Sequence, residues 1–257
     1  MGLFKTVLNT IPRPLLIKGS YIAKPFLALY YRGNTFTDPI DGKSYRKFLP
    51  YGYENIRENA LAPGTLSLER HRLLYLYLKT YSNFFSQENL KVLHVAPEQC
   101  FYKLFRNQKN LQYTTTDLFS PLADVKADIC DLPFEDNSFD VVLCNHVLEH
   151  IEDDKKAMQE IYRVLKPGAY AILQIPQDYS LEKTYEDTSI TSPEERKKHF
   201  GQYDHVRIYG WDYFDRLKKL GFEVKKVQIQ KDLKTEDLER YALVKEEVIP
   251  VVFKPLS

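Results

Sequence analysis

After residue 88 the chain alternates between short β-branched or aliphatic runs and amphipathic stretches of helical length. The expected strands cover residues 91–95, 113–116, 139–144, 170–175, 223–230 and 240–245, and the expected helices cover 100–107, 153–165 and 211–220. Alternation of this kind builds βαβ units. The sequence therefore predicts an α/β fold, with a Rossmann-like, doubly wound and mostly parallel sheet.

The residues before 88 have a different character. They are rich in Tyr, Arg and Pro, and they end in the helix-like run SLERHRLLYLYLKTYSNFF, with Ser67 as its expected N-cap. We therefore expect an N-terminal appended segment over residues 1–87 and one main domain over residues 88–257.

Charge and cysteine content exclude several classes of protein. The formal net charge is +1, so no overall field favours nucleic acid as a partner. The three cysteines, Cys100, Cys130 and Cys144, are widely spaced, which indicates a reduced, cytoplasmic protein. No apolar run is long enough to span a membrane.

The N-terminal stretch IPRPLLIKGSYIAKPFLALYY is apolar but is interrupted by Arg13, Lys18 and Lys24. We expect it to pack on the fold, and weak contact of residues 1–30 with a membrane surface is the alternative. The start MGLFKT also fits the loose pattern for myristoylation. The sequence does not determine an oligomeric state.

Ligands of doubly wound sheets bind at the carboxyl ends of the strands. Four such ends carry polar residues, in VAPEQC, TTTDLF, NHVLEHIEDD and IPQDYS. Asp117 ends the second strand about 20 residues after the first turn, the spacing at which an acidic side chain reaches ribose hydroxyls. An acidic residue that only shapes the turn is the alternative.

The segment ADICDLPFEDNSFDVVLCNHVLEHIEDDKKAMQEIYRVLKPGAYAILQIP resembles the central part of class I S-adenosylmethionine-dependent methyltransferases, in particular a type 11-like branch. DHVRIYGWDYFDRLKKLGFEV is similar to the C-terminal part of that branch. The resemblance covers about residues 90 to 230. It implies a seven-stranded sheet, S-adenosylmethionine as cofactor and methyl transfer as activity.

The first turn departs from the family, which usually has D-V-G-x-G-x-G there. LHVAPEQC places His94 at the acidic position, and Ala96, Glu98 and Cys100 replace the three glycines. Glycine permits positive φ and close approach of the backbone to a ligand. S-adenosylmethionine carries no phosphate, so a wider turn can still hold it, and Glu98 is expected to pair with its ammonium group.

The resemblance assigns further residues to the cofactor. Asp117, beside Leu118, would hold the ribose hydroxyls, and Asp128 would accept from the adenine amino group. Ile129 would cover the adenine ring, and Asn145 would face the methyl group. Asp131 is an alternative to Asp128, because both acids lie close to the end of the third strand.

An acceptor that carries a proton requires a base, and imidazole titrates near neutral pH. His205, His146 and His150 are the catalytic candidates, with Glu149 beside two of them and Arg207 as a candidate partner for an anionic substrate group. If a helix begins at NHVLEH, His146 and His150 share one face. A metal ion is an alternative there, but the H-E-x-x-H order is absent, and we predict no metal.

The N-terminal segment resembles a small zinc knuckle that has lost its cysteines. Asp38, Asp41, Ala62 and Thr65 occupy the four metal positions. Because structural zinc needs thiolate or imidazole ligands, we predict no zinc there. Arg70, in the cluster over residues 69–72, is expected to face a substrate.

Two functions follow from these patterns. The first is a methyltransferase that uses S-adenosylmethionine and acts on a small-molecule or lipid-like acceptor. The second is a non-catalytic binding or scaffold protein on the same fold, which the glycine-free turn favours. The sequence does not identify the acceptor.

Overall fold

The computed structural model of the protein describes residues 12–52 and 55–256, and the chain forms two compact units. The first unit contains Met1–Gln87, Glu98–Gln108 and Gln228–Glu247, and the second contains Glu88–Pro97, Lys109–Val227 and Val248–Ser257. Each unit therefore combines segments that are far apart in the sequence. The MGLFKT start lies outside the described residues.

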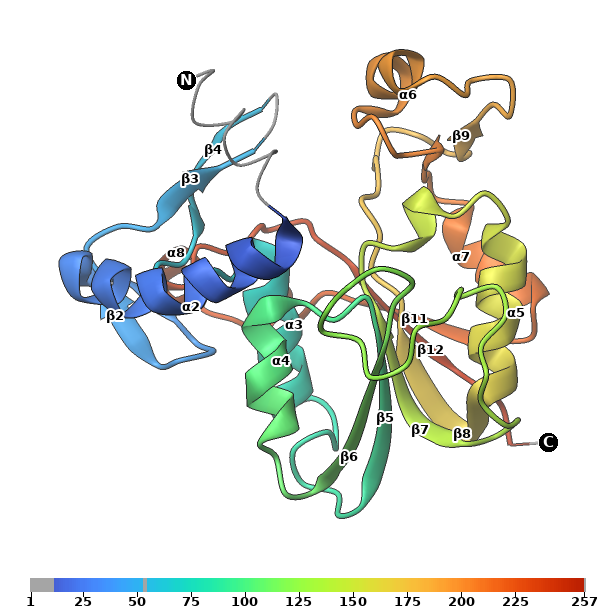
Figure 1. The fold of residues 1–257 in the computed structure, drawn as a ribbon, viewed down its shortest axis with the longest axis horizontal. Helices are drawn as coiled ribbons and strands as arrows, with labels where there is room; N and C mark the ends of the chain where they lie inside the picture. The colour runs from blue at the N-terminus through green and yellow to red at the C-terminus, as the bar shows by residue number, and fades with distance from the viewer. Residues whose placement is uncertain (1–11, 53–54, 257) are drawn as a thin grey trace. The chain divides into compact units, whose positions relative to one another are not determined.

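The second unit is built on a six-stranded sheet in the described part of the chain (Figure 1). Its strands, in spatial order, are β11 (Glu223–Val227), β12 (Ile249–Phe253), β8 (Leu165–Ile172), β7 (Phe139–Cys144), β5 (Leu90–Val95) and β6 (Leu111–Thr116). Strands β8, β7, β5 and β6 are parallel, and β12 is antiparallel to both of its neighbours. The predicted α/β fold is confirmed.

The expected seven strands are not confirmed, since the described residues place six strands in this sheet. The strand expected at residues 240–245 was wrong, because that segment follows helix α8 (Thr235–Arg240) in the first unit. The strand that completes the sheet is β12, which was not among the expected strands.

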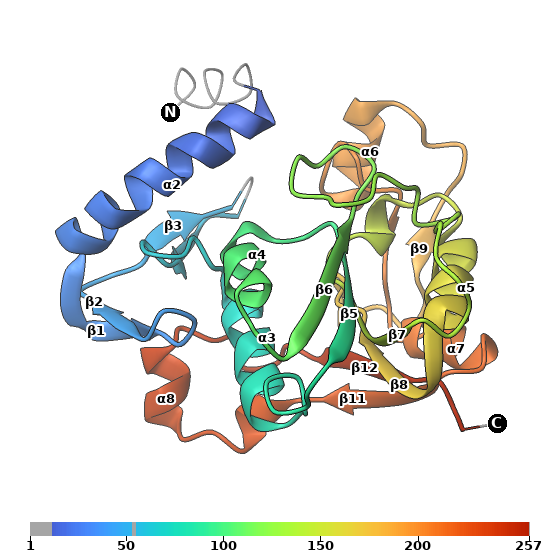
Figure 2. The ribbon, with the colours of Figure 1, turned by 60° about the horizontal axis from the view of Figure 1, so that its bottom comes forward.

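Helices α5 (Asp154–Val164) and α7 (Tyr213–Lys219) lie on the same face of this sheet in both ribbon views (Figures 1 and 2). Ile161 of α5 and Leu217 of α7 are fully buried in one core with Val142 of β7. The shorter elements are η1 (Leu148–His150), β9 (Tyr185–Glu186), α6 (Pro193–Phe200) and β10 (Arg207–Ile208), with β9 and β10 paired antiparallel.

The first unit joins helices to two antiparallel hairpins, β1 with β2 and β3 with β4. In chain order its elements are α2 (Arg13–Tyr30), β1 (Arg32–Asp38), β2 (Lys43–Tyr45), β3 (Leu49–Tyr51), β4 (Arg57–Leu61), α3 (Glu69–Thr80), α4 (Gln99–Arg106), η2 (Ile229–Lys231) and α8. The predicted N-cap of α3 was wrong. Leu68, not Ser67, occupies the N-cap position, and the His71 ring accepts a hydrogen bond from the backbone N–H of Leu68.

Hydrogen bonds connect the side chains at the positions that resemble a zinc knuckle. Asp38 is fully buried, and its Oδ2 accepts from Thr65 Oγ1 at 2.5 Å and from Ser67 Oγ at 3.0 Å. Asp41 Oδ2 accepts from Tyr45 Oη at 2.7 Å. The two bonds of Asp38 connect the end of β1 with the segment before α3 that holds Thr65 and Ser67.

Helix α2 exposes apolar side chains to solvent. Leu15, Ile22, Phe26 and Leu29 are each more than half exposed, so much of the apolar surface of this helix does not pack as expected. Among the described residues, no helix is both long and apolar enough to cross a bilayer.

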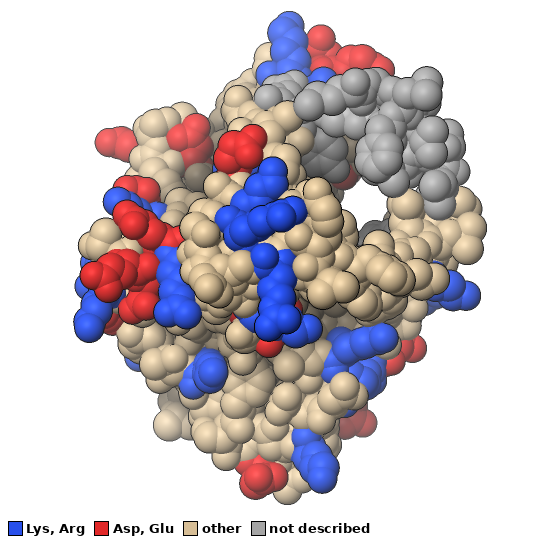
Figure 3. Space-filling model, turned by 90° about the vertical axis from the view of Figure 1, so that its left-hand side faces the viewer, with Lys and Arg blue, Asp and Glu red and all other residues tan. Residues whose placement is uncertain are grey.

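Lys and Arg occur together with Asp and Glu on the face shown in Figure 3, as the small net charge leads one to expect.

Arg72 is the largest fully buried side chain of the first unit. Its guanidinium donates to the backbone oxygens of Ala60 and Ser67, each at 2.9 Å, and to those of Tyr241 and Ala242 at 2.7 and 2.9 Å. Burial lowers the pKa of Arg72 to about 10, so the side chain is still charged at neutral pH.

We expect Arg72→Met to destabilise the protein by about 3 kcal/mol or more, because buried carbonyl oxygens lose their donor. Urea denaturation followed by circular dichroism measures the change. Arg106→Met, at an exposed arginine of α4, is the matched control and should change the unfolding free energy by less than about 0.5 kcal/mol. Equal effects of the two substitutions would contradict the role of Arg72.

Candidate active site

Three parallel strands of the second unit end at the same level of the sheet. Val95 of β5 pairs with Thr116 of β6 and with Cys144 of β7. The residues that follow, Ala96, Asp117 and Asn145, therefore begin their loops side by side at the carboxyl edge, where doubly wound sheets bind ligands.

The turn after β5 keeps a glycine-like backbone without glycine. Ala96 has φ 49°, in the left-handed region, and its N–H donates to Thr116 O at 2.8 Å. A side chain with a Cβ costs about 1–2 kcal/mol in this conformation. The turn thus has the backbone form that glycine usually supplies, and a methyl group is the only addition at Ala96.

Asp117 is oriented by its own loop. Its Oδ1 accepts from the backbone N–H groups of Phe119 at 2.7 Å and Ser120 at 2.5 Å. Within the described part of the chain its Oδ2 makes no hydrogen bond, so this oxygen is available to a hydroxyl pair. Leu118 and Phe119 beside it are exposed. The assignment of Asp117 and Leu118 to the cofactor stays a prediction.

The other residues predicted to bind the cofactor lie in different settings. Asp128 is exposed, and its Oδ1 accepts from Cys130 N at 2.8 Å, whereas Ile129 is buried in the core of the unit. His94 is fully buried, with Nδ1 2.7 Å from Tyr113 Oη on the neighbouring strand. Its place is therefore in the interior of the sheet.

Two of the predicted residues belong to the first unit. Glu98 Oε1 lies 3.9 Å from His71 Nε2. Arg70 has a buried Nε that forms no hydrogen bond within the described residues. Their assignment to cofactor and substrate stays a prediction.

The loop after β7 differs from the helix expected at NHVLEH. His146 has φ 53°, and its N–H donates to Gln174 O at 2.8 Å. The 3-10 helix η1 begins only at Leu148. His146 and His150 therefore do not share a helical face, but both rings approach Glu149 Oε1, with His146 Nδ1 at 3.4 Å and His150 Nε2 at 4.0 Å.

Glu149 is a buried carboxylate, with a residue exposure of 1%. Burial alone would raise the pKa of Glu149, but the hydrogen bond with His146 and the electrostatic effect of the nearby His146 and His150 rings outweigh burial and lower it. Glu149 is therefore ionised at neutral pH.

His205, the third predicted histidine, joins the same group. Its ring packs edge-to-face on His150, with centroids 4.8 Å apart, and the residue is buried. Burial lowers the pKa of His205, so its imidazole is neutral near pH 7. His150 and His205, which are more than 50 residues apart in the sequence, thus lie beside the same carboxylate.

Arg207 has a structural role, and its prediction as a substrate partner is corrected. The side chain is 4% exposed and donates to the backbone oxygens of Leu148, Ile151 and Glu152 at 2.9, 2.5 and 2.9 Å. Its Nε also donates to Glu186 Oε2 at 2.9 Å. Because its donors are engaged in these bonds, Arg207 fixes the loop that carries Glu149 and His150.

Gln174 is a residue that the sequence analysis missed. It lies two residues after the end of β8 and is 2% exposed, yet neither Nε2 nor Oε1 has a hydrogen-bond partner within the described residues. A buried amide without partners costs about 1–3 kcal/mol, so the side chain is suited to bind a ligand. The available signal was a polar residue that interrupts the apolar run YAILQIP.

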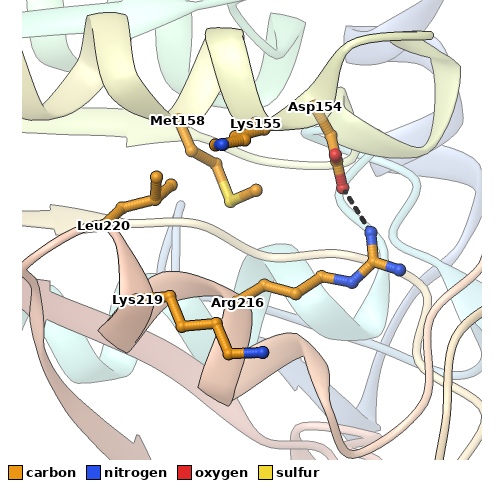
Figure 4. A pocket seen from close by; sticks show the side chains of 6 residues that line it. All are labelled: Asp154, Lys155, Met158, Arg216, Lys219 and Leu220. Atoms are coloured by element: carbon orange, nitrogen blue, oxygen red, sulfur yellow. Dashed lines mark hydrogen bonds and ion pairs between the residues drawn. The ribbon is translucent and has the colours of Figure 1, made fainter.

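A cavity of about 280 Å³ opens between α5 and α7 (Figure 4). It is lined by Asp154, Lys155, Met158, Arg216, Lys219 and Leu220. Arg216 Nη1 lies 3.3 Å from Asp154 Oδ2, which also accepts from Tyr209 Oη at 2.8 Å. None of the predicted site residues lines this cavity, and its polar wall belongs to an ion-pair network that supports the fold.

Comparison with known proteins supports the resemblance. Residues 82–173 match the methyltransferase domain family. The match covers about a third of the chain, and this segment of the protein is similar to methyltransferase domains.

Individual relatives match over shorter stretches. A 2-phytyl-1,4-naphtoquinone methyltransferase from Nostoc punctiforme is 44% identical over 52 residues, which are 20% of this chain and 23% of that protein. The chain thus spans about a quarter of the length of this relative.

Two solved structures share the fold. The [4+2]-cyclase SpnF has a TM-score of 0.52 at 16% identity, covering 86% of this chain and 92% of its own. The YcgJ protein of Bacillus subtilis has a TM-score of 0.50 at 15% identity, covering 72% and 99%.

The strained turn makes a prediction about stability. Ala96→Gly should raise the unfolding free energy by up to about 1 kcal/mol, because glycine adopts positive φ without the steric cost of a Cβ. Urea denaturation measures the change in the unfolding free energy, and thermal unfolding measures the change in melting temperature. Ala127→Gly, at an alanine whose φ is not positive, is the control and should not raise the unfolding free energy. A loss of stability in Ala96→Gly would show that the turn is not strained.

Proposed function

We propose that this protein transfers a methyl group from S-adenosylmethionine to a small-molecule or lipid-like acceptor. The observation that carries the proposal is the carboxyl edge formed by β5, β6 and β7, with the anchored carboxylate of Asp117 beside the left-handed turn at Ala96. Relatives named as a naphtoquinone methyltransferase and as a sterol methyltransferase-like protein support the lipid-like class of acceptor.

The reaction is a displacement at carbon. S-adenosylmethionine supplies a methyl group on a sulfonium: a lone pair of the acceptor forms the new bond to that carbon, the C–S bond breaks with its electrons staying on sulfur, and any acceptor proton leaves to a base or to water. The protein must align the two partners and exclude water. Asp117 and Asp128 hold the cofactor in this proposal, and Asn145 and Gln174 contact the acceptor side.

A non-catalytic binding protein is the second candidate. The observation in its favour is the glycine-free turn, in which Ala96, Glu98 and Cys100 stand where three glycines are usual. The likeness of the fold to a cyclase also shows that the architecture alone does not determine the reaction.

Binding of the cofactor separates these candidates. We expect calorimetric titration to show micromolar binding of S-adenosylmethionine and of its demethylated product. Asp117→Ala should weaken it about 10- to 100-fold, through loss of charged hydrogen bonds of roughly 1.5–3 kcal/mol.

Asp215→Ala, at an exposed aspartate of α7, is the matched control and should bind like the wild type. Absence of binding to either ligand at millimolar concentration would contradict the methyltransferase proposal and favour the non-catalytic candidate. Equal binding by Asp117→Ala and the wild type would remove Asp117 from the cofactor site.

We also propose weak contact of α2 with a membrane surface, where a lipid-like acceptor would be met. The support is the set of exposed apolar side chains together with an exposed lysine, Lys18, on a helix that has no acidic residue.

We expect the protein to co-sediment with vesicles that contain anionic lipid, and Phe26→Glu to reduce the bound fraction severalfold, because the substitution places a charge in the apolar interfacial region. Tyr203→Glu, at an equally exposed aromatic residue of the second unit, is the control. Unchanged sedimentation of Phe26→Glu would remove α2 from the contact.

A further inference from the structure

A compact group of potential metal ligands lies in the second unit. Glu149, His150 and His205 each offer one ligand atom, and these atoms lie within 4.8 Å of one another. The first two residues belong to η1, and the third precedes β10. Glu149 and His205 are buried, whereas the His150 side chain is 33% exposed, so the group is reachable from solvent.

Each of the two imidazole rings makes a hydrogen bond to the backbone. His150 Nδ1 lies 3.2 Å from the backbone oxygen of Asp204 and 3.4 Å from its Oδ2. A carbonyl oxygen only accepts, so Nδ1 carries the proton and Nε2 presents a lone pair. The His205 ring likewise hydrogen-bonds to the backbone of Phe200. Metal-bound histidines show this arrangement, with the second nitrogen donating to a carbonyl or carboxylate.

Glu149 supplies the second, independent observation. The side chain is 1% exposed, and its Oε2 has no hydrogen-bond partner within the described residues. Oε1 lies near His146 Nδ1 at 3.4 Å and His150 Nε2 at 4.0 Å. A buried carboxylate oxygen without a partner is costly, and a bound cation would satisfy it.

The backbone holds the two ligand-bearing segments together. Val206 N donates to Glu149 O at 2.9 Å, so the residue after His205 is hydrogen-bonded to the ligand residue of η1. Arg207 then binds the carbonyl oxygens of Leu148 and Ile151, on either side of Glu149 and His150. The ligands therefore sit on a fixed frame, as a preorganised site requires.

We propose that Glu149, His150 and His205 bind a divalent transition-metal ion. Two imidazole nitrogens and one carboxylate oxygen favour Zn²⁺, Co²⁺, Mn²⁺ or Fe²⁺ over Mg²⁺ and Ca²⁺, which prefer oxygen ligands alone. Three protein ligands leave coordination positions open, as in catalytic rather than structural sites. An oxygen of the acceptor would fill one of them.

The metal site stands on the geometry of the three side chains alone, whereas its use in binding an acceptor rests on the proposed methyl transfer. This site departs from the sequence-based prediction of no metal, and it differs from the alternative weighed at NHVLEH, because His205 replaces His146 as the second imidazole. A histidine and carboxylate cluster that uses only hydrogen bonds and water is the competing arrangement.

The test is binding of Co²⁺ and Zn²⁺ to metal-stripped protein without S-adenosylmethionine. We expect one equivalent of Zn²⁺ by calorimetry, and visible absorption of bound Co²⁺ that Zn²⁺ displaces. Glu149→Gln and His205→Ala should each weaken binding at least about tenfold. His199→Ala is the matched control, since His199 Nε2 pairs with Glu195 Oε2 at 3.3 Å in α6, and it should bind like the wild type.

Folding is checked separately by circular dichroism and melting temperature, and His150→Gln gives a third, milder variant if His205→Ala is unstable. Absence of Co²⁺ and Zn²⁺ binding at millimolar concentration would overturn the proposal, and so would equal binding by the wild type and all folded cluster variants. Binding of S-adenosylmethionine by protein that binds no metal would overturn only the metal site and leave the proposed methyl transfer intact.

Discussion

The candidate site depends on one constraint, the common level at which β5, β6 and β7 end. Val95 is paired on both sides, so the loops that begin at Ala96, Asp117 and Asn145 cannot shift relative to one another without breaking the parallel ladder. A slip of one residue in any strand would also reverse which side chains enter the core. The buried apolar faces of the strands thus fix the positions of polar residues that contribute nothing to the core.

This constraint explains which parts of the site could be predicted. The strands are short apolar or β-branched runs, so their ends were visible in the sequence, and with them Asp117 and Asn145. The replacement of glycine at Ala96 was visible too, but its meaning was not. Whether alanine abolishes a turn or adopts its conformation depends on the hydrogen bond from Ala96 N to Thr116 O, which no local pattern reveals.

Long-range contacts could not be predicted in the same way. The sequence spacing predicted that His146 and His150 share one helical face if a helix begins there. The left-handed backbone at His146 prevents this, and His205, from a loop more than 50 residues away in the chain, lies beside His150 instead. The strand expected at residues 240–245 was also wrong. The strand that completes the sheet is β12 instead, and the backbone oxygen of its Pro250 accepts a hydrogen bond from Leu173 N.

Both units resolve the same difficulty by the same means. Irregular segments leave backbone oxygens inside the protein without ladder partners, and each must be satisfied. In the first unit Arg72 donates hydrogen bonds to four such backbone oxygens, and in the second unit Arg207 donates to three. A planar guanidinium carries enough donors to do this from one position. In a sequence such an arginine resembles a substrate-binding residue, because only the folded chain shows where its donors point. Burial of Arg207 among carbonyl oxygens therefore turns a predicted binding residue into the support for Glu149 and His150.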